Sequence, residues 1–135
     1  FVGSIQFVAA HAALILGWVV LNAVLSTRAA FDPYPFVFLN LVLNAIEAMP
    51  DGGTLTVRTT AGQNVALIEI EDTGIGIADD IRAHLFEPFF TNKPNGTGLG
   101  LSISAHIVTQ HIGQIEVEST AGVGSIFRVV LPYQP

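Results

Sequence analysis

The sequence predicts an α/β fold of the α+β kind: a two-layer sandwich in which helices cover one face of a mixed, mainly antiparallel sheet. First, two stretches, 36–49 and 99–111, carry apolar residues at helical spacing. Second, two further stretches, 53–73 and 114–132, alternate apolar and polar residues on either side of a short turn, which is typical of β-hairpins. Helices and hairpins follow one another along the chain, so packing their apolar faces together gives one core.

The first helix is predicted at residues 36–49. Leu39, Leu43 and Ile46 recur there at helical spacing, and we expect them to form its apolar side. The sequence PDGG at 50–53 ends the helix, because proline and glycine interrupt regular helical structure.

The first hairpin is predicted to join residues 53–60 to residues 65–73 through the short link AGQN. A short helix is expected next, near 79–86. Asp79 and Asp80 favour its start, because negative charge complements the positive end of a helix dipole.

The last helix, 99–111, opens directly out of a glycine-rich stretch. Its apolar residues are Leu101, Ile103, Ile107 and Val108. A second hairpin follows, in which QIEVEST and GSIFRVVLP are joined through AGVG. The glycines therefore lie at the beginning of a helix.

Composition limits what the chain can be. Its 135 residues suffice for one domain with a core and are too few for two ordinary ones. The absence of cysteine excludes disulfides and thiolate metal sites. A formal net charge of −6, with five basic residues spread along the chain, does not suit the nucleic-acid backbone. We therefore expect a single domain, 1–135, that binds no nucleic acid.

The glycine-rich stretch is a candidate phosphate site. A helix N-terminus offers unpaired N–H groups and the positive end of the dipole, and Gly96, Gly98 and Gly100 let a ligand approach them. Lys93, just upstream, adds a positive charge. The stretch is not a P-loop, because no lysine follows the glycines, and the dinucleotide-binding motif fails because Asp79 stands where a third glycine is needed.

Four stretches occur together and in order: NLVLNAIEA at 40–48, DTGIGI at 72–77, FEPFF at 86–90 and GTGLGL at 96–101. With them, the sequence from about Phe36 to Pro132 resembles the ATP-binding domain of sensor histidine kinases. That domain belongs to the superfamily shared with gyrase, mismatch-repair and heat-shock chaperone ATPases, and the four stretches correspond to its N, G1, F and G2 boxes. The resemblance implies the Bergerat-type ATP-binding fold.

The resemblance implies that Asp72 binds the adenine base of ATP, and the chemistry of this residue agrees. This residue ends an alternating strand, and its carboxylate can accept a hydrogen bond from the exocyclic amine of adenine. Ser125 matches a hydroxyl position that supports the same edge in relatives. The contacts implied for ATP come from Asp72, Gly74, Gly76, Ile77, Phe86, Thr91, Lys93, Gly96, Thr97, Gly98, Leu99, Gly100, Leu101 and Ser125.

The resemblance also implies the catalytic group, which is Asn40, Asn44 and Lys93. Asn44 corresponds to the family's Mg²⁺ ligand, and an amide oxygen suits a hard cation. Asn40 stands where gyrase-like relatives have a glutamate that activates water, and an amide cannot take that proton. The expected reaction is therefore phosphoryl transfer from Mg-ATP to an outside nucleophile. Glu47, seven residues beyond Asn40, is expected only to solvate the helix surface.

Residues 86–96 correspond to the lid over the nucleotide. The resemblance implies that Phe86 and Phe89 anchor the lid against the core. Thr91, Asn92 and Lys93 are the lid side chains expected near the phosphates, with Lys93 the strongest candidate.

Two features depart from the family. His11 is not followed by the residues that mark the phospho-accepting histidine, and His84, His106 and His111 lie among the ATP-binding boxes, where we interpret them as helix residues. The acceptor is therefore expected on a dimerisation domain elsewhere, with a response regulator as a further partner. Residues 1–35 are unusually apolar, and 7–25 are uncharged and long enough to cross a bilayer.

We favour an apolar helix and strand for residues 1–35, because their length fits the fold; a membrane segment and a foreign sequence remain alternatives. We expect a cytoplasmic domain, which the N-terminal segment or the full-length protein could attach to a membrane. Two other functions stay open: a nucleotide-responsive binding module without transfer, and a gyrase-like or mismatch-repair-like ATPase.

Overall fold

The computed structural model describes residues 35–94 and 96–132. The chain divides into two units, Phe1–Pro33 and Tyr34–Pro135, and every described residue belongs to the second. The helix, strand or membrane segment predicted within 1–35 therefore lies outside the described residues, apart from the last position.

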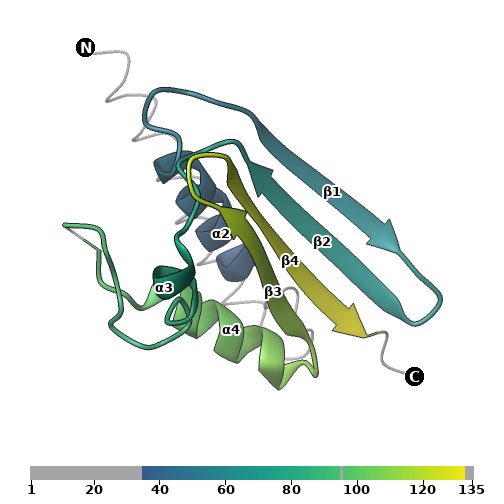
Figure 1. Ribbon diagram of the computed structural model, residues 1–135. Coiled ribbons are helices and arrows are strands. Elements are labelled where there is room, and N and C mark those ends of the chain that lie inside the picture. The colour runs from purple at the N-terminus through teal and green to yellow at the C-terminus, as the bar shows by residue number, and fades with distance from the viewer. Residues whose placement is uncertain (1–34, 95, 133–135) are drawn as a thin grey trace, which may run out of the picture. The chain divides into compact units, whose positions relative to one another are not determined.

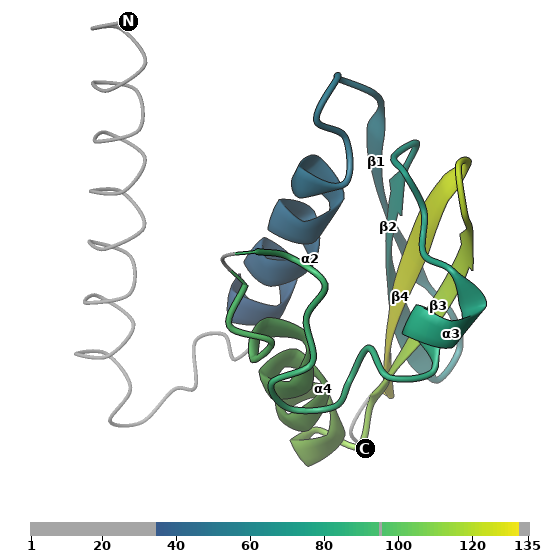
Figure 2. The same ribbon diagram turned by 60° about the vertical axis from the view of Figure 1, so that its left-hand side comes forward.

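The described part of the second unit, residues 35–94 and 96–132, holds four strands and three helices. The order is α2 (Pro35–Glu47), β1 (Leu55–Ala61), β2 (Val65–Asp72), α3 (Asp79–Arg82), α4 (Gly100–Gln110), β3 (Gln114–Thr120) and β4 (Gly124–Pro132). The strands form one sheet in the order β1-β2-β4-β3, and each neighbouring pair is antiparallel. Figures 1 and 2 show α2 and α4 side by side on one face of this sheet. This is the predicted two-layer α+β sandwich.

The core lies between the two helices and the sheet. It is built from Val37, Leu41 and Ala45 of α2, Ile70 of β2, Val108 of α4, and Phe127 and Val129 of β4. Spacings of four residues place the α2 members on one side of that helix, and alternate residues of β4 point inward because a strand has a period of two. The apolar side of each helix therefore packs against the inward-facing residues of the strands, and together they form one core.

The helix α2 was predicted correctly, but the side assigned to its core was wrong. Leu43 is 46% exposed and Ile46 is 51% exposed, whereas Val37 and Leu41 are fully buried. The stretch is apolar almost all round, so periodicity alone could not choose between two apolar sides. The choice is made by tertiary packing, which buries Val37, Leu41 and Ala45 against the sheet and α4.

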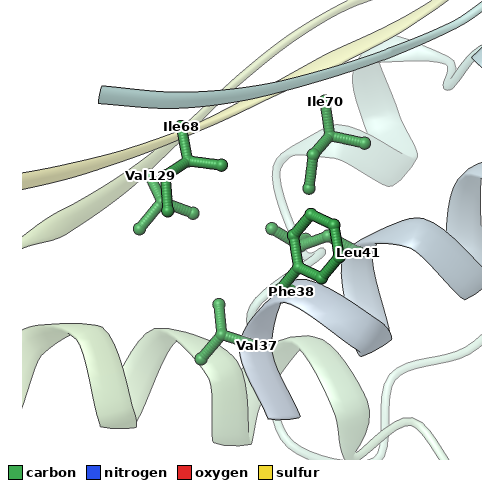
Figure 3. A pocket seen from close by; sticks show the side chains of 6 residues that line it. All are labelled: Val37, Phe38, Leu41, Ile68, Ile70 and Val129. Atoms are coloured by element: carbon green, nitrogen blue, oxygen red, sulfur yellow. The ribbon is translucent and has the colours of Figure 1, made fainter. Parts of the chain in front are cut away.

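A small apolar cavity lies where the first turns of α2 meet the sheet. Its six lining residues, Val37, Phe38, Leu41, Ile68, Ile70 and Val129, approach one another from the helix and from two strands (Figure 3). Its volume is about 10 Å³, which is barely enough for one water molecule, and no polar group lines it. It is a packing defect, too small to hold a ligand larger than water.

The helix predicted near residues 79–86 is shorter than expected. Only Asp79–Arg82 is α-helical, and the chain continues as tight turns in which Glu87 N–H donates to His84 O and Phe90 N–H donates to Glu87 O. Pro88 has no N–H to extend a helix. The Arg82 guanidinium donates to Ser119 O at 3.3 Å, which ties α3 to the end of β3.

The sheet face opposite the helices carries a row of ion pairs. Glu69 on β2 lies between Arg58 on β1 and Arg128 on β4 in the strand register. Its carboxylate contacts Arg58 at 2.9 Å and Arg128 at 2.8 Å. Hydrogen bonds from Arg128 and then Arg58 hold the pKa of Glu69 below its ordinary value. Arg58 also contacts Glu71, and Arg128 also contacts Glu118.

Candidate nucleotide-binding site

One side of α2 carries the two predicted catalytic amides. Asn40 and Asn44 are one helical turn apart, and Asn44 Nδ2 donates to Asn40 Oδ1 at 3.3 Å. Both residues are partly buried. The hydrogen bond orients the Asn44 amide so that its oxygen points away from Asn40.

The lid reaches that oxygen through Lys93. Lys93 Nζ donates to Asn44 Oδ1 at 2.8 Å and also forms an ion pair with the Glu47 carboxylate. The predicted phosphate-binding lysine therefore lies beside the predicted metal ligand. Glu47 is a residue that sequence reasoning missed, because we expected it only to solvate the helix. No spacing in the sequence connects it to a lysine so far along the chain.

The glycines that precede α4 allow close packing against the lid and α2. Gly98 has φ of +67°, and a Cβ there would lie 2.3 Å from the Phe89 carbonyl carbon. Its carbonyl oxygen accepts a hydrogen bond from Phe89 N–H at 2.9 Å. A Cβ on Gly100 would lie 2.3 Å from Asn40 Nδ2. The N-terminus of α4 is therefore pressed against the amide pair of α2.

Asp72 is the last residue of β2 and is buried, with 4% of its surface exposed. Its Oδ1 accepts a hydrogen bond from Gly74 N–H at 2.8 Å. A carboxylate has two oxygens that accept several hydrogen bonds, so this local bond fixes the side chain without exhausting it. A buried acid held in this way is suited to read a donor on a ligand.

Ser125 lies opposite Asp72 in the register between β2 and β4, and it is equally buried. Its hydroxyl lies 3.0 Å from Ser119 Oγ. Ser119 Oγ also donates to Gly124 O at 2.9 Å and accepts from Ile77 N–H at 2.8 Å. Because Ser119 has one proton and donates it to Gly124, Ser125 is the donor between the two hydroxyls. Ser119 is a second supporting residue that sequence reasoning missed.

The loop after β2 is held from two sides through the backbone of Ile75. Ile75 N–H donates to Ala48 O at 2.9 Å, just beyond α2, and Gly122 N–H donates to Ile75 O at 2.7 Å. Gly76 has φ of +65°, and a Cβ there would lie 2.0 Å from Thr120 O. Only glycine fits between this loop and the β3–β4 turn.

A hollow of about 360 Å³ opens beside this loop. It is lined by Ile77, Ala78, Asp79, Ser119, Thr120 and Ala121. The lining includes Ser119, which hydrogen-bonds to Ser125. Asp72 and the glycines before α4 do not line this hollow.

The remaining predicted residues lie in three segments. Gly74, Gly76 and Ile77 are in the loop after β2, and Phe86 is in the turns after α3. Thr91, Lys93, Gly96, Thr97, Gly98 and Leu99 are in the lid and the approach to α4, which Gly100 and Leu101 begin.

The anchoring role expected of Phe89 was wrong. Its side chain is 74% exposed and its φ is +68°, whereas Phe86 is partly buried. The Phe89 backbone, rather than its ring, is the part that packs, because it hydrogen-bonds to Gly98 and approaches it closely.

The helix α2 connects the two ends of the candidate site. Asn40 contacts the start of α4, and Ala48 contacts the loop that follows Asp72. The two residues are eight positions apart, which is about 12 Å along a helix axis. That separation is one that a nucleotide can span.

Comparison with known proteins identifies the class. The described residues form a four-stranded antiparallel sheet covered on one face by α2 and α4. A family model described as "Histidine kinase-, DNA gyrase B-, and HSP90-like ATPase" matches residues 34–135, and the chain belongs to this family.

Three relatives illustrate the match. Sporulation kinase E of Bacillus subtilis (strain 168) is 48% identical over 97 residues, which cover 71% of this chain and 13% of that protein. The structure of the mycobacterial sensor histidine kinase MprB superposes with a TM-score of 0.67 at 33% identity, covering 76% of this chain and 72% of that one. Full-length ShkA in complex with AMPPNP gives a TM-score of 0.66 at 29% identity, covering 74% of this chain and 21% of that one.

This chain therefore spans a small fraction of the curated kinases that it resembles, 13% of sporulation kinase E and 22% of sporulation kinase C. A second family model, described as "Protein of unknown function (DUF1003)", matches residues 2–51. It overlaps the ATPase match over α2. Within residues 35–94 and 96–132, no helix has the length and hydropathy needed to cross a bilayer.

Proposed function

We propose that this chain is the catalytic, ATP-binding domain of a sensor histidine kinase, which transfers the γ-phosphoryl group of Mg-ATP to a histidine outside the chain. The observation that supports this most directly is the convergence of Asn40, Asn44, Lys93 and Gly100 along one side of α2. Family membership and the histidine kinase relatives give this convergence its chemical meaning.

The purine is proposed to bind at the Asp72 end. The Asp72 carboxylate would accept from the exocyclic amine of adenine, while the oxygen of guanine would face it unfavourably. Ser125 would support this edge as an acceptor, because its proton is directed to Ser119. Gly74, Gly76 and Ile77 shape the loop that covers the base.

The phosphates are proposed to lie at the N-terminus of α4. This helix has 11 residues, so its unpaired N–H groups and dipole favour negative charge. Gly96, Thr97, Gly98, Leu99, Gly100 and Leu101 would provide close backbone approach, and Phe86, Thr91 and Lys93 would contribute from the lid. Such contacts hold the reacting phosphoryl group in place, which is the main source of catalysis in this reaction class.

The residues present fit a magnesium ion. Asn44 Oδ1 already accepts from a cation, the Lys93 ammonium, at 2.8 Å. Among the described residues, no three His, Cys, Asp or Glu side chains come together as a metal site. Asn44 would therefore supply one oxygen, with the phosphates and water supplying the others. When bound, magnesium neutralises charge on the phosphates.

Asn40 supports transfer rather than hydrolysis, because a neutral amide cannot accept a proton from water. The proposed acceptor is a histidine on a dimerisation domain, in a missing part of the protein or another chain, and the phosphoryl group would then pass to a response regulator. Among the histidines described, His84 contacts Glu87 and His111 contacts Ile107 O, both within their own turns.

The domain arrangement stays a proposal too. We infer one ATP-binding domain with an atypical apolar segment before it, residues 1–35. A cytoplasmic position follows from the use of ATP, and any membrane attachment would come from the N-terminal segment or from the full-length protein.

Two experiments test the function. Calorimetric titration of the chain with a non-hydrolysable ATP analogue, with and without magnesium, should show magnesium-dependent binding. Mixing the chain with Mg-ATP and a matched dimerisation domain should then label the histidine of that domain. Binding without label would favour a nucleotide-responsive module, and steady hydrolysis abolished by Asn40→Ala would favour an ATPase of the gyrase type.

A further inference from the structure

We propose that Glu47 is a positioning residue: in the nucleotide-free domain it holds the Lys93 ammonium on Asn44 Oδ1, so that the lid lysine occupies the place of magnesium. This inference rests on the proposed function. Glu47 lies within the N box, but it is not among the residues expected to contact ATP or magnesium.

The first support is geometry. Asn44 and Glu47 are three residues apart on α2 and present neighbouring side chains. Lys93 reaches both of them from a loop that belongs to a different part of the chain. A lysine ammonium has three donors, so it can bond both oxygens at once. These two contacts tie the lid to α2.

The second support is the orientation of the Asn44 amide. Its Nδ2 is used by Asn40, so its oxygen is directed toward the lid, where Lys93 meets it. The same oxygen is the one proposed for magnesium. The observed orientation is the only one in which the Asn44 oxygen faces the lid while its Nδ2 donates to Asn40.

Competition follows from charge and distance. Magnesium binds oxygen at about 2.0–2.1 Å. An ammonium 2.8 Å from that oxygen would then lie against a divalent cation without a counterion between them. Lys93 must therefore leave Asn44 when the magnesium nucleotide binds, and it becomes available to the phosphates. Glu47 sets how readily it leaves.

The size of the effect is modest. The side chains of Lys93 and Glu47 are 44% and 55% exposed, and ion pairs exposed to this extent change an equilibrium by up to about five-fold. Removing the Glu47 charge should therefore strengthen binding of the magnesium nucleotide by up to about five-fold, and should strengthen magnesium-free binding less.

A simpler explanation would be direct repulsion, because the Glu47 carboxylate could repel the triphosphate whether or not Lys93 is present. A double-mutant cycle separates the two. The full chain is compared with Glu47→Gln, Lys93→Met and the double variant, each titrated calorimetrically with AMPPNP with and without magnesium. Glu116→Gln, on an exposed position of β3, is the matched control for charge.

We expect Glu47→Gln to strengthen magnesium-dependent binding in the wild-type background and to have no effect in the Lys93→Met background. Equal strengthening in both backgrounds would overturn the inference in favour of direct repulsion. Weaker binding by Glu47→Gln alone would overturn it as well, because the carboxylate would then support the bound state.

A measurement without nucleotide keeps the two proposals apart. Hydrogen–deuterium exchange of the lid amides, residues 86–96, should rise in Glu47→Gln and in Lys93→Met, and the double variant should exceed neither. Unchanged exchange overturns the role of Glu47. If exchange rises as expected but the wild-type chain binds no AMPPNP, the proposed function fails instead.

Discussion

Asp72 and Ser125 face each other across β2 and β4 as a register pair, and both are almost completely buried. They lie at the end of the central strand pair and, with Ser104 of α4, are the buried polar residues among those the structure describes. Each has a defined hydrogen bond within the chain, Asp72 with Gly74 N–H and Ser125 with Ser119. The pair is therefore oriented before any ligand arrives, which lowers the entropy cost of binding.

Replacing Asp72 with asparagine should weaken ATP binding while leaving the fold intact. The amide oxygen can still accept from Gly74 N–H, but the charge that strengthens the bond to the adenine amine is lost. Hydrogen bonds to charged groups contribute about 1.5–3 kcal/mol, so we expect affinity to fall by about ten-fold or more. Calorimetry measures the affinity and circular dichroism checks the fold. Unchanged affinity would remove Asp72 from the purine site.

Replacing Gly100 with alanine should impair the site through Asn40. Alanine is a good helix former at this position, but its Cβ would lie 2.3 Å from Asn40 Nδ2. We expect the helix content to persist and nucleotide affinity to drop. Gly62→Ala is the matched control, because its nearest neighbour would be 3.4 Å away. Equal affinity in the two variants would show that the contact with Asn40 has no role in binding.

The buried side of α2 can be tested by a pair of leucines. Leu41→Ala should destabilise the domain by about 2–5 kcal/mol, because Leu41 is fully buried and truncation leaves a cavity. Leu43→Ala should cost about 1 kcal/mol or less, because its side chain is 46% exposed. Urea denaturation of both variants gives the free energies of unfolding. Similar losses would contradict the assigned orientation of the helix.

Stability should depend on pH through Glu69. Its pKa is lowered in the folded domain by Arg128 and then Arg58, so its ionised form stabilises the fold at neutral pH. This contribution is fully present above the ordinary pKa of a glutamate, about 4.3, and is lost as pH falls through the lowered value.

Glu69→Gln should therefore be less stable than the parent chain at pH 7, and the difference should shrink as pH falls through the acid range. Asp51→Asn, at an exposed turn position between α2 and β1 and therefore outside this row of strand residues, is the control. The test is to measure the free energy of unfolding of the parent chain and of both variants at several pH values. If the difference between Glu69→Gln and the parent chain does not change with pH, the predicted role of Glu69 is wrong.

Several features of the fold could be predicted from the sequence because they depend on local order. The two hairpins follow from alternation and turn residues, and β1 to β4 lie where they were expected. The glycine stretch was correctly placed at the start of α4. Its contact with Asn40, by contrast, depends on how α2 and α4 pack.

The features that could not be predicted come from contacts between distant segments. Lys93 and Glu47, 46 residues apart, meet only because the lid folds back on α2. Phe89 was expected in the core because aromatic residues usually bury their rings, whereas its positive φ and its bond to Gly98 direct the ring outward. Such contacts have no periodic signal.

Asn40 lies within α2 and Ala48 directly follows its last residue, so the length of this helix fixes the distance between the two halves of the candidate site. A helix turns by about 100° and advances 1.5 Å for every residue added. One alanine inserted between Asn44 and Ala48 would leave the sequences of the sheet and the glycines unaltered. It would change the distance and the angle between the proposed purine and phosphate sites, so we expect one nucleotide no longer to bind both. Length within this helix should therefore tolerate less variation than the identity of its exposed side chains.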